Sequence, residues 1–240
     1  MELNICHLYP DILNLYGDRG NVTCLKKRLE WRGIDCNVEG VSIGDKLEAS
    51  KYDLFFIGGG QDFEQGVLLQ DLSGEKTAEI EKVFLAICGG YQILGSYYKT
   101  WDGQQCDFLG ALDLYTVGQK DRMIGNYMYE CDDLGGQTVV GFENHSGQTF
   151  LGDGVKPIGK VLSGYGNNGK DGYEGARYKN VYATYSHGCL LPKNPAIADM
   201  LIRWALERKY PGFQLEPLAD TLENRAHNYM EERLRAAQNR

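Results

Sequence analysis

The alternation of apolar and polar residues over the first hundred positions constrains the fold most strongly. Strand-like apolar runs cover Leu3 to Tyr9, Ile34 to Val41 and Tyr52 to Ile57, and a helix-forming stretch, Val22 to Arg32, separates the first two. Phe84 to Ile87 continues the series as a further buried strand. Parallel strands need long crossover connections, which are usually helical. The alternation therefore predicts a doubly wound α/β fold.

The second half of the chain follows a different pattern, rich in aromatic residues and punctuated by glycine. Arg122 to Cys131 and Thr138 to Phe142 are typical of β-strands, and we expect them to lie antiparallel on one side of the main sheet. Ser163 to Gly175 contains a cluster of glycine and asparagine residues. These residue types favour turns, so this segment is predicted to be an exposed loop.

Two helices are expected near the end of the sequence. The first covers Ala196 to Lys209, and the second, Leu218 to Arg235, is heavily charged with apolar positions at helical spacing. We expect this apolar stripe to dock on the domain or on a partner. The chain has no internal repeat and no long linker, so residues 1–240 are predicted to form a single domain.

Charge and hydropathy exclude several classes of partner. The chain carries 25 basic and 33 acidic residues, a net charge of −8, which disfavours nucleic acid because its phosphates would be repelled. No segment approaches the roughly 18 consecutive apolar residues of a membrane helix. Met1 leads directly into a strand-like run that lacks the features of a signal peptide. We therefore expect a cytoplasmic protein with no membrane insertion.

Metal ions and cofactors are not expected either. The seven cysteines form no Cys-x-x-Cys pair, which suits free thiols in a reducing compartment. His187 and Cys189 lie two positions apart, but no second ligand pair is near them in the sequence. Gly58-Gly59-Gly60 resembles a phosphate-binding loop, yet it lacks the Lys-Ser/Thr pair of that motif. Nucleotide binding is therefore not predicted.

Cys88 occupies a position that favours a nucleophile. An apolar strand ends at this residue, and Gly89 and Gly90 then permit a sharp turn into a helix that we expect to run from Gly90 to about Tyr98. Such a turn exposes the side chain, and a helix N-terminus favours a thiolate. The alternative is a small buried cysteine whose glycine neighbours serve only close packing.

The same turn predicts an oxyanion hole. The backbone N–H of Gly89, together with an N–H from Gly59 or Gly60 at the end of the neighbouring strand, could face one point. Tetrahedral intermediates of acyl transfer need two such donors, because negative charge develops on the former carbonyl oxygen.

A thiolate nucleophile needs an acid–base partner, and histidine suits this role because its pKa lies near neutrality. His187 follows the strand-like segment Val181 to Ser186, at a strand end where catalytic groups of α/β sheets gather. His145, which we expect in a polar loop after a strand, is the main rival. His7 lies within a strand and His227 within the charged terminal helix, so both are predicted to be structural or solvated.

These segments resemble the class I glutamine amidotransferases, within them the cobyric acid synthase type. The Cys88 segment is similar to the family's G-x-C-x-G-x-Q turn, Gly141 to Gly147 to its G-Y-E-x-H-x-G segment, and Ala183 to Gly188 to its catalytic-histidine segment. The resemblance implies a flavodoxin-like doubly wound sheet with additional antiparallel strands. It also implies that Cys88 attacks L-glutamine, that His187 is the general acid and base, and that Arg122 binds glutamine.

A narrower resemblance is to the amidotransferase subunits of lipid II isoglutaminyl synthases. It rests on Leu8 to Asp11, Tyr16 to Asn21, Gly58 to Asp62 and the Cys88 segment. It implies a heterodimer with a MurT-like Mur ligase subunit, which would use the ammonia to amidate the D-glutamate α-carboxyl of lipid II. Asp18 and Arg19 belong to a loop that should border the same cleft, although turn formation would also explain them.

Two departures from the family pattern concern the site. Ala86 replaces the first glycine of the turn, and Cys189 stands where typical members carry a glutamate two residues after the histidine. A thiol cannot orient an imidazole as a carboxylate can. We therefore hypothesise that an acidic residue of the partner orients His187. Alternative functions are the amidation of corrinoids or other carboxylates, and a catalytically idle subunit that regulates a ligase.

Overall fold

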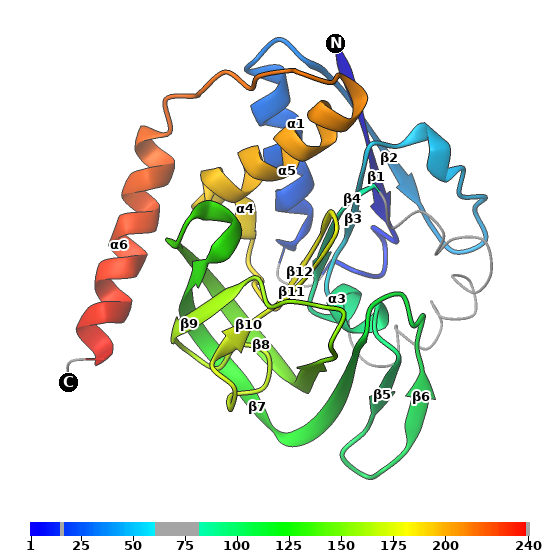
Figure 1. Cartoon of the computed structure of the whole chain (residues 1–240), viewed down its shortest axis with the longest axis vertical. Helices are drawn as coiled ribbons and strands as arrows, with labels where there is room; N and C mark the ends of the chain where they lie inside the picture. The colour runs from blue at the N-terminus through cyan, green and yellow to red at the C-terminus, as the bar shows by residue number, and fades with distance from the viewer. Residues whose placement is uncertain (15–16, 61–81, 239–240) are drawn as a thin grey trace.

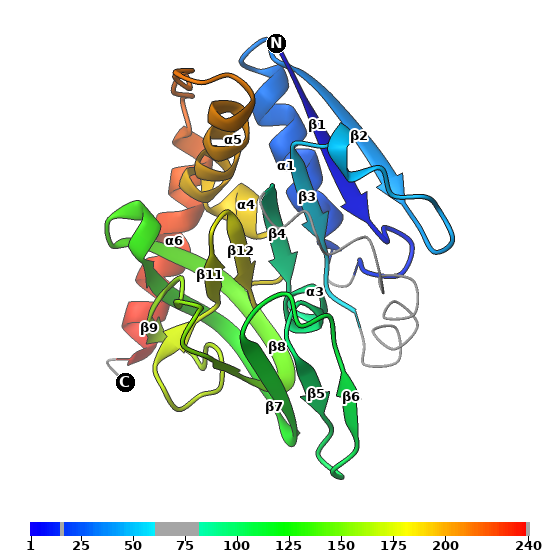
Figure 2. The same cartoon turned by 45° about the vertical axis from the view of Figure 1, so that its right-hand side comes forward.

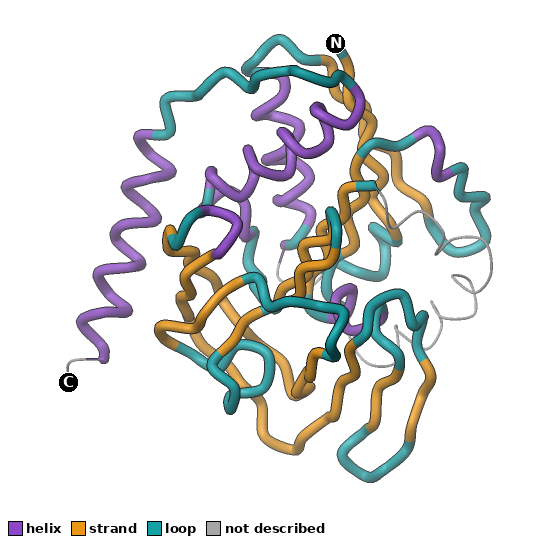
Figure 3. The backbone as a smooth tube through the Cα atoms, viewed as in Figure 1, coloured by secondary structure: helices purple, strands orange, loops and turns teal. Residues whose placement is uncertain are grey.

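The computed structural model describes residues 1–14, 17–60 and 82–238 (Figure 1). Tyr16, Gln61 and Asp62, which contribute to the family resemblance, lie outside the described residues. The described chain forms two sheets, one mainly parallel and one mainly antiparallel, with helices packed around them (Figure 3).

The first sheet confirms the expected parallel arrangement. Its strand order is β2-β1-β3-β4-β12, with β11 as an antiparallel edge, and the five parallel strands follow the 2-1-3-4-5 order of flavodoxin-like sheets. The strands are β1 (Glu2–Leu8), β2 (Asp35–Val41), β3 (Leu54–Ile57), β4 (Val83–Ile87), β11 (Ala176–Tyr178) and β12 (Val181–Thr184). Because β3 and β12 are buried along their whole length, their sequences are continuous apolar runs rather than alternating ones.

Helices cover one face of this sheet, as Figure 2 shows for α1 (Arg19–Glu30), α4 (Leu190–Lys193) and α5 (Pro195–Lys209). A buried arginine fixes α1 to α5 and to the residue just before the last helix. Arg28 of α1 donates to Asp199 of α5 and to Asp220, each over 2.7 Å. A buried guanidinium needs such partners, because an unpaired charge in the interior is costly. These ion pairs hold α1 against α5, and they thereby also fix the position of the loop that leads into α1.

The second sheet lies between β4 and β12 in the sequence. It has the order β10-β9-β7-β5-β6, with β8 paired to β7. Its strands are β5 (Tyr97–Lys99), β6 (Gln105–Asp107), β7 (Leu114–Cys131), β8 (Gln137–Leu151), β9 (Gly159–Ser163) and β10 (Tyr173–Glu174), and two short 3₁₀ helices cover Ala49–Lys51 and Asp132–Leu134. The expected strands are confirmed, and both are longer than predicted because β7 and β8 form one long hairpin.

Three sequence predictions are corrected here. The helix after Cys88, α3 (Gly89–Ile93), ends well before Tyr98, because the chain turns at Gly95, where a Cβ would overlap Leu114 of β7. The segment 163–175 is not a wholly exposed loop, since Asn167 and Asn168 are buried and their side chains bond to backbone groups around it. His145, expected in a loop, lies within β8.

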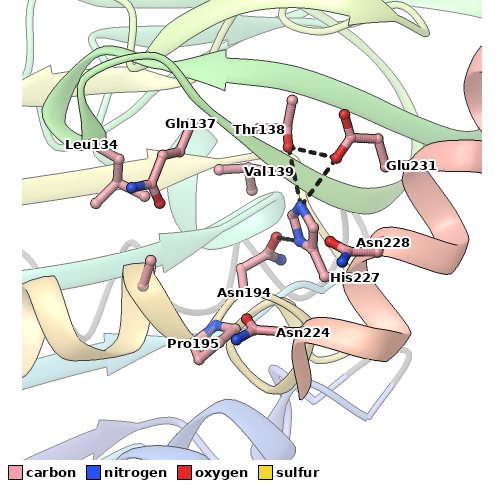
Figure 4. Close-up of a pocket in the computed structure, with 11 residues that line it drawn as sticks. Leu134, Gln137, Thr138, Val139, Asn194, Pro195, Asn224, His227, Asn228 and Glu231 are labelled. Atoms are coloured by element: carbon pink, nitrogen blue, oxygen red, sulfur yellow. Dashed lines mark hydrogen bonds and ion pairs between the residues drawn. The ribbon is translucent and has the colours of Figure 1, made fainter. Parts of the chain in front are cut away.

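The last helix, α6 (Thr221–Gln238), packs against the antiparallel sheet, at the left of Figure 1. Part of the expected apolar stripe docks on the domain, since Leu234 packs with Met128 and Val140, whereas Leu222 and Tyr229 are exposed. His227 joins α6 to the sheet through Thr138, over 3.0 Å. This histidine lines a cavity of about 290 Å³, and Figure 4 shows it between Thr138, Glu231 and Asn194. Its contacts make it structural, as the sequence indicated.

None of the helices in the described ranges combines the length and apolarity needed to span a membrane.

Candidate active site

Four strand ends of the parallel sheet bring the candidate residues together. Asp18 follows β1, the Gly58-Gly59-Gly60 segment follows β3, Cys88 follows β4, and His187 follows β12. These strands are neighbours and run in the same direction, so their carboxyl ends meet at one edge. Ligands and catalytic groups of open α/β sheets lie at this edge, where the strand order reverses.

Cys88 has the backbone of a strained turn. Its φ of 49° and ψ of −105° lie in a region that residues other than glycine rarely adopt. The turn is held from both sides, because the N–H of Cys88 donates to Thr184 over 2.9 Å and that of Gly90 donates to Gly58 over 3.2 Å. A Cβ at Gly90 would lie 2.9 Å from the Gly58 oxygen. The predicted sharp turn is therefore present and glycine permits its tight fit, but the Cys88 side chain is buried rather than exposed as predicted.

His187 lies where the two sheets meet. Its backbone N–H donates to the carbonyl of Phe142 in β8 over 2.7 Å, and the two residues form an antiparallel bridge. The imidazole is buried, its Nδ1 lies 3.3 Å from Oδ2 of Asp18, and Cys88 lies close enough to raise its pKa. A Cβ at Gly59 would overlap its ring. The structure therefore places His187 beside Cys88, at the ends of the neighbouring strands β12 and β4, as the predicted pairing requires.

The carboxylate that orients His187 comes from this chain. Oδ2 of Asp18 lies 3.3 Å from Nδ1 of His187 and also accepts the N–H of Gly59 over 2.9 Å, and the Asp18 side chain is fully buried. The hypothesis that a partner must supply this group is therefore not needed. Asp18 belongs to the Tyr16 to Asn21 segment that carries the family resemblance. Because this segment is far from His187 in the sequence, the contact between the two residues could not be predicted from the sequence.

The surroundings of His187 favour the imidazolium. Burial lowers its pKa, but the charge of Cys88, hydrogen bonds to Asp18 and Cys88, and the charge of Asp18 outweigh burial and raise the pKa to about 10. An adjacent negative charge stabilises the protonated ring. At neutral pH the ring can therefore donate a proton to a leaving group beside Cys88.

The expected oxyanion donors differ in their surroundings. The N–H of Gly59 donates to Asp18, whereas Gly89 begins α3, and the N–H groups of a first helical turn have no partner within the helix. Gly60 follows Gly59 at the end of β3. We therefore keep Gly89 and Gly60 as proposed donors, and Gly59 as the residue that leaves space for His187.

Arg122 lies on β7 beside an irregularity in the β7–β8 register, between Gly118 and Met123. Its guanidinium is exposed and donates to the Asn144 side chain over 2.8 Å and to the Asn144 carbonyl over 3.1 Å. A guanidinium has five N–H donors, and the Asn144 amide carries no charge to neutralise it. The exposed side of the Arg122 guanidinium can therefore donate to a carboxylate.

The rival histidine has structural contacts. His145 is buried, its Nδ1 lies 2.7 Å from the carbonyl of Gly147, and its ring stacks on Tyr185 with centroids 3.6 Å apart. His7 is buried in β1, where desolvation, followed by the charge of Arg19, lowers its pKa to about 4.

The described part of the chain contains no cluster of three or more His, Cys, Asp or Glu side chains suited to a metal ion.

Comparisons with known proteins agree with this geometry. A family model described as the CobB/CobQ-like glutamine amidotransferase domain matches residues 4–195. The glutamine-hydrolysing lipid II isoglutaminyl synthase subunit GatD of Streptococcus pneumoniae R6 is 43% identical over 215 residues, covering 87% of this chain and 82% of that protein. The subunit of the same name from Staphylococcus aureus N315 is 44% identical over 221 residues, covering 90% and 88%.

A solved structure supports the fold. The glutaminase domain of Trypanosoma brucei CTPS with bound acivicin aligns over 89% of this chain and 96% of its own, with a TM-score of 0.53 and 10% sequence identity.

Proposed function

Because the chain belongs to the CobB/CobQ-like glutamine amidotransferase domain family, we propose that it hydrolyses L-glutamine at Cys88 and delivers the ammonia for amidation of lipid II. The observation that carries this proposal is the chain of contacts from Cys88 through His187 to Asp18 at one sheet edge. Relatives at 43% and 44% identity that are named as lipid II isoglutaminyl synthase subunits support the choice of acceptor.

The first half of the reaction forms a thioester. The sulfur of Cys88 attacks the side-chain amide carbon of glutamine, and negative charge moves to the amide oxygen, where Gly89 and Gly60 donate hydrogen bonds. His187 then gives its proton to the amide nitrogen, the C–N bond breaks, and ammonia leaves. The product is a γ-glutamyl thioester on Cys88.

The second half restores the enzyme. A water molecule gives a proton to the now neutral His187 and attacks the thioester carbon, the C–S bond breaks, and glutamate leaves. Asp18 keeps the imidazole in one orientation and stabilises its charged form through both halves. Arg122 binds the α-carboxylate of glutamine by charge-assisted hydrogen bonds.

Amidation of the proposed acceptor calls for a second activity besides glutamine hydrolysis. Amidation of a carboxyl group needs prior activation by ATP, and this sequence contains no Walker motif. We infer a heterodimer with a MurT-like Mur ligase subunit in the cytoplasm, which activates the D-glutamate α-carboxyl and yields D-isoglutamine. Residues 1–240 act as a single amidotransferase domain in this proposal, consistent with the backbone bridge between the two sheets at His187.

Transfer of labelled nitrogen tests the function. The chain and its ligase partner are supplied with amide-¹⁵N glutamine, ATP and lipid II, and the products are analysed by mass spectrometry. We expect ¹⁵N in the α-amide of D-isoglutamine, its loss with Cys88→Ala, and its retention with Cys106→Ala, which changes an exposed cysteine. Glutamate release without amidation of lipid II would indicate a glutaminase with another acceptor.

A further inference from the structure

We propose that Cys189 positions Asp18 against His187 by fastening the loop between β1 and α1 to the turn that follows β12. This inference rests on the proposed glutaminase function and adds a residue that supports the acid–base group without touching substrate. Cys189 lies two residues after His187, and Asp18 lies in the loop that Cys189 contacts.

The backbone of the turn directs the thiol into the loop. Gly188 and Cys189 have φ values of 70° and 53°, two successive left-handed residues of which only the first is glycine. A residue other than glycine is strained in this region and persists where its surroundings hold it. The conformation of Cys189 is thus consistent with a side chain held in place by its contacts.

Those contacts lie on both sides of Asp18. Sγ of Cys189 donates to the carbonyl of Gly17 over 2.9 Å, and the same sulfur lies against Gly20, where a Cβ would overlap it. Asp18 lies between these two residues in the sequence. Its carboxylate in turn reaches His187 over 3.3 Å. One side chain therefore links the loop that carries the carboxylate to the turn that carries the imidazole.

The first turn of α1 and the residue before Asp18 leave room for the thiol. A Cβ at Gly20 would overlap Sγ of Cys189, and Gly17 has a φ of 78° that favours glycine. Because position 20 has no side chain, the thiol can lie directly against the backbone at the start of α1. The backbone at Gly17 and Gly20 thus accommodates the side chain that the left-handed conformation of Cys189 directs toward it.

The thiol does not act as a substitute carboxylate. Desolvation, followed by the charge of Asp18, raises the pKa of Cys189, so the sulfur keeps its proton near neutral pH. A protonated thiol can donate to the Gly17 carbonyl but carries no charge to stabilise the imidazolium. Its contribution is therefore geometric, and catalysis is sensitive to displacements of about 1 Å in an orienting group.

Substitutions at position 189 separate positioning from general stability. With the ligase partner present, we expect Cys189→Ala to lower kcat for glutamine hydrolysis about 10-fold and to leave KM within about twofold. The alkaline limb of its pH profile should move to lower pH, because a displaced Asp18 supports the imidazolium less. Cys189→Ser should recover most of the rate, since a hydroxyl donates in the same way.

Two further variants complete the test. Cys24→Ala changes another half-buried thiol, one on α1, and should keep the wild-type rate and pH profile. In an Asp18→Asn background, Cys189→Ala should cause no further loss, because the group it positions has already been neutralised.

Three results would overturn the proposal: an unchanged rate for Cys189→Ala, a serine variant as slow as the alanine variant, or additive losses in the double variant with Asp18→Asn. Full activity of Cys88→Ala would instead refute the glutaminase function on which the inference rests. The two failures are therefore distinguishable.

Discussion

Oδ2 of Asp18 lies 3.3 Å from Nδ1 of His187 and accepts the N–H of Gly59 over 2.9 Å. One buried carboxylate oxygen thereby joins the ends of β1, β3 and β12 around the imidazole. The contact completes a Cys-His-Asp arrangement within this chain. It also gives the proposed site a carboxylate, although Cys189 stands where the family pattern described above has glutamate.

Asp18→Asn should impair glutamine hydrolysis. We expect kcat/KM to fall on the order of 10²-fold or more, because the amide neither orients the acid–base group correctly nor stabilises its charge. The pKa of His187 is raised to about 10, partly by Asp18. Proton donation by the wild type should thus persist until the pH rises through about 10, and the variant should lose it at lower pH. A rate–pH profile measures both, with the exposed Asp35→Asn as control.

Gly59→Ala should slow catalysis without unfolding the protein. A methyl group there would overlap the His187 ring and approach Asp18 Oδ2 to 3.2 Å, so the ring must move. Displacement of the acid–base group should reduce kcat about 10-fold or more. Gly125→Ala is the matched control, because its Cβ would meet open space. Equal rates for the two variants, measured with similar circular dichroism spectra, would contradict the assigned position of His187.

Arg122→Ala should weaken glutamine binding more than the chemical step. Hydrogen bonds to a charged group contribute about 1.5–3 kcal/mol, which corresponds to a KM increase of roughly 10- to 100-fold with a much smaller change in kcat. Arg122→Lys should be intermediate, since it keeps the charge but loses the planar donors. Initial rates against glutamine concentration measure both constants. An unchanged KM for Arg122→Ala would show that Arg122 does not bind glutamine.

Glu174→Gln should increase stability at alkaline pH. Burial, together with the charge of Glu143, raises the pKa of this carboxyl from 4.5 to about 7, despite hydrogen bonds from Tyr185 and Thr184. Between these values the folded protein keeps a proton that the unfolded chain releases. The free energy of unfolding of the wild type therefore decreases as pH rises from 4.5 to 7 and is level above that.

Glu174→Gln lacks the titrating carboxyl, so its free energy of unfolding does not decrease over this pH range. At pH 8 the variant should therefore be more stable than the wild type by up to about 3 kcal/mol. Near pH 4.5 the gain should be absent. Urea unfolding at pH 5 and pH 8 measures the difference. A constant offset between the two proteins at both pH values would show that Glu174 has an ordinary pKa.

Local sequence signals located the nucleophile and its base. A strand that ends in Cys88 before two glycines, and a strand that ends in His187, require no knowledge of distant residues, and both lie where expected. Asp18 was identified only as a residue near the cleft, because its partner is far away in the sequence. The burial of Asn167 likewise depends on tertiary contacts, such as the hydroxyl of Tyr91 at 3.1 Å.

Covalent labelling by a diazo-ketone glutamine analogue tests most directly the claim that Cys88 is the nucleophile. The analogue alkylates a cysteine that attacks it in the glutamine site, and peptide mass spectrometry identifies the residue. We expect one adduct per chain, on Cys88, absent from Cys88→Ala and slower to form in Asp18→Asn. An adduct on another cysteine, or no adduct with the ligase partner present, would contradict the account.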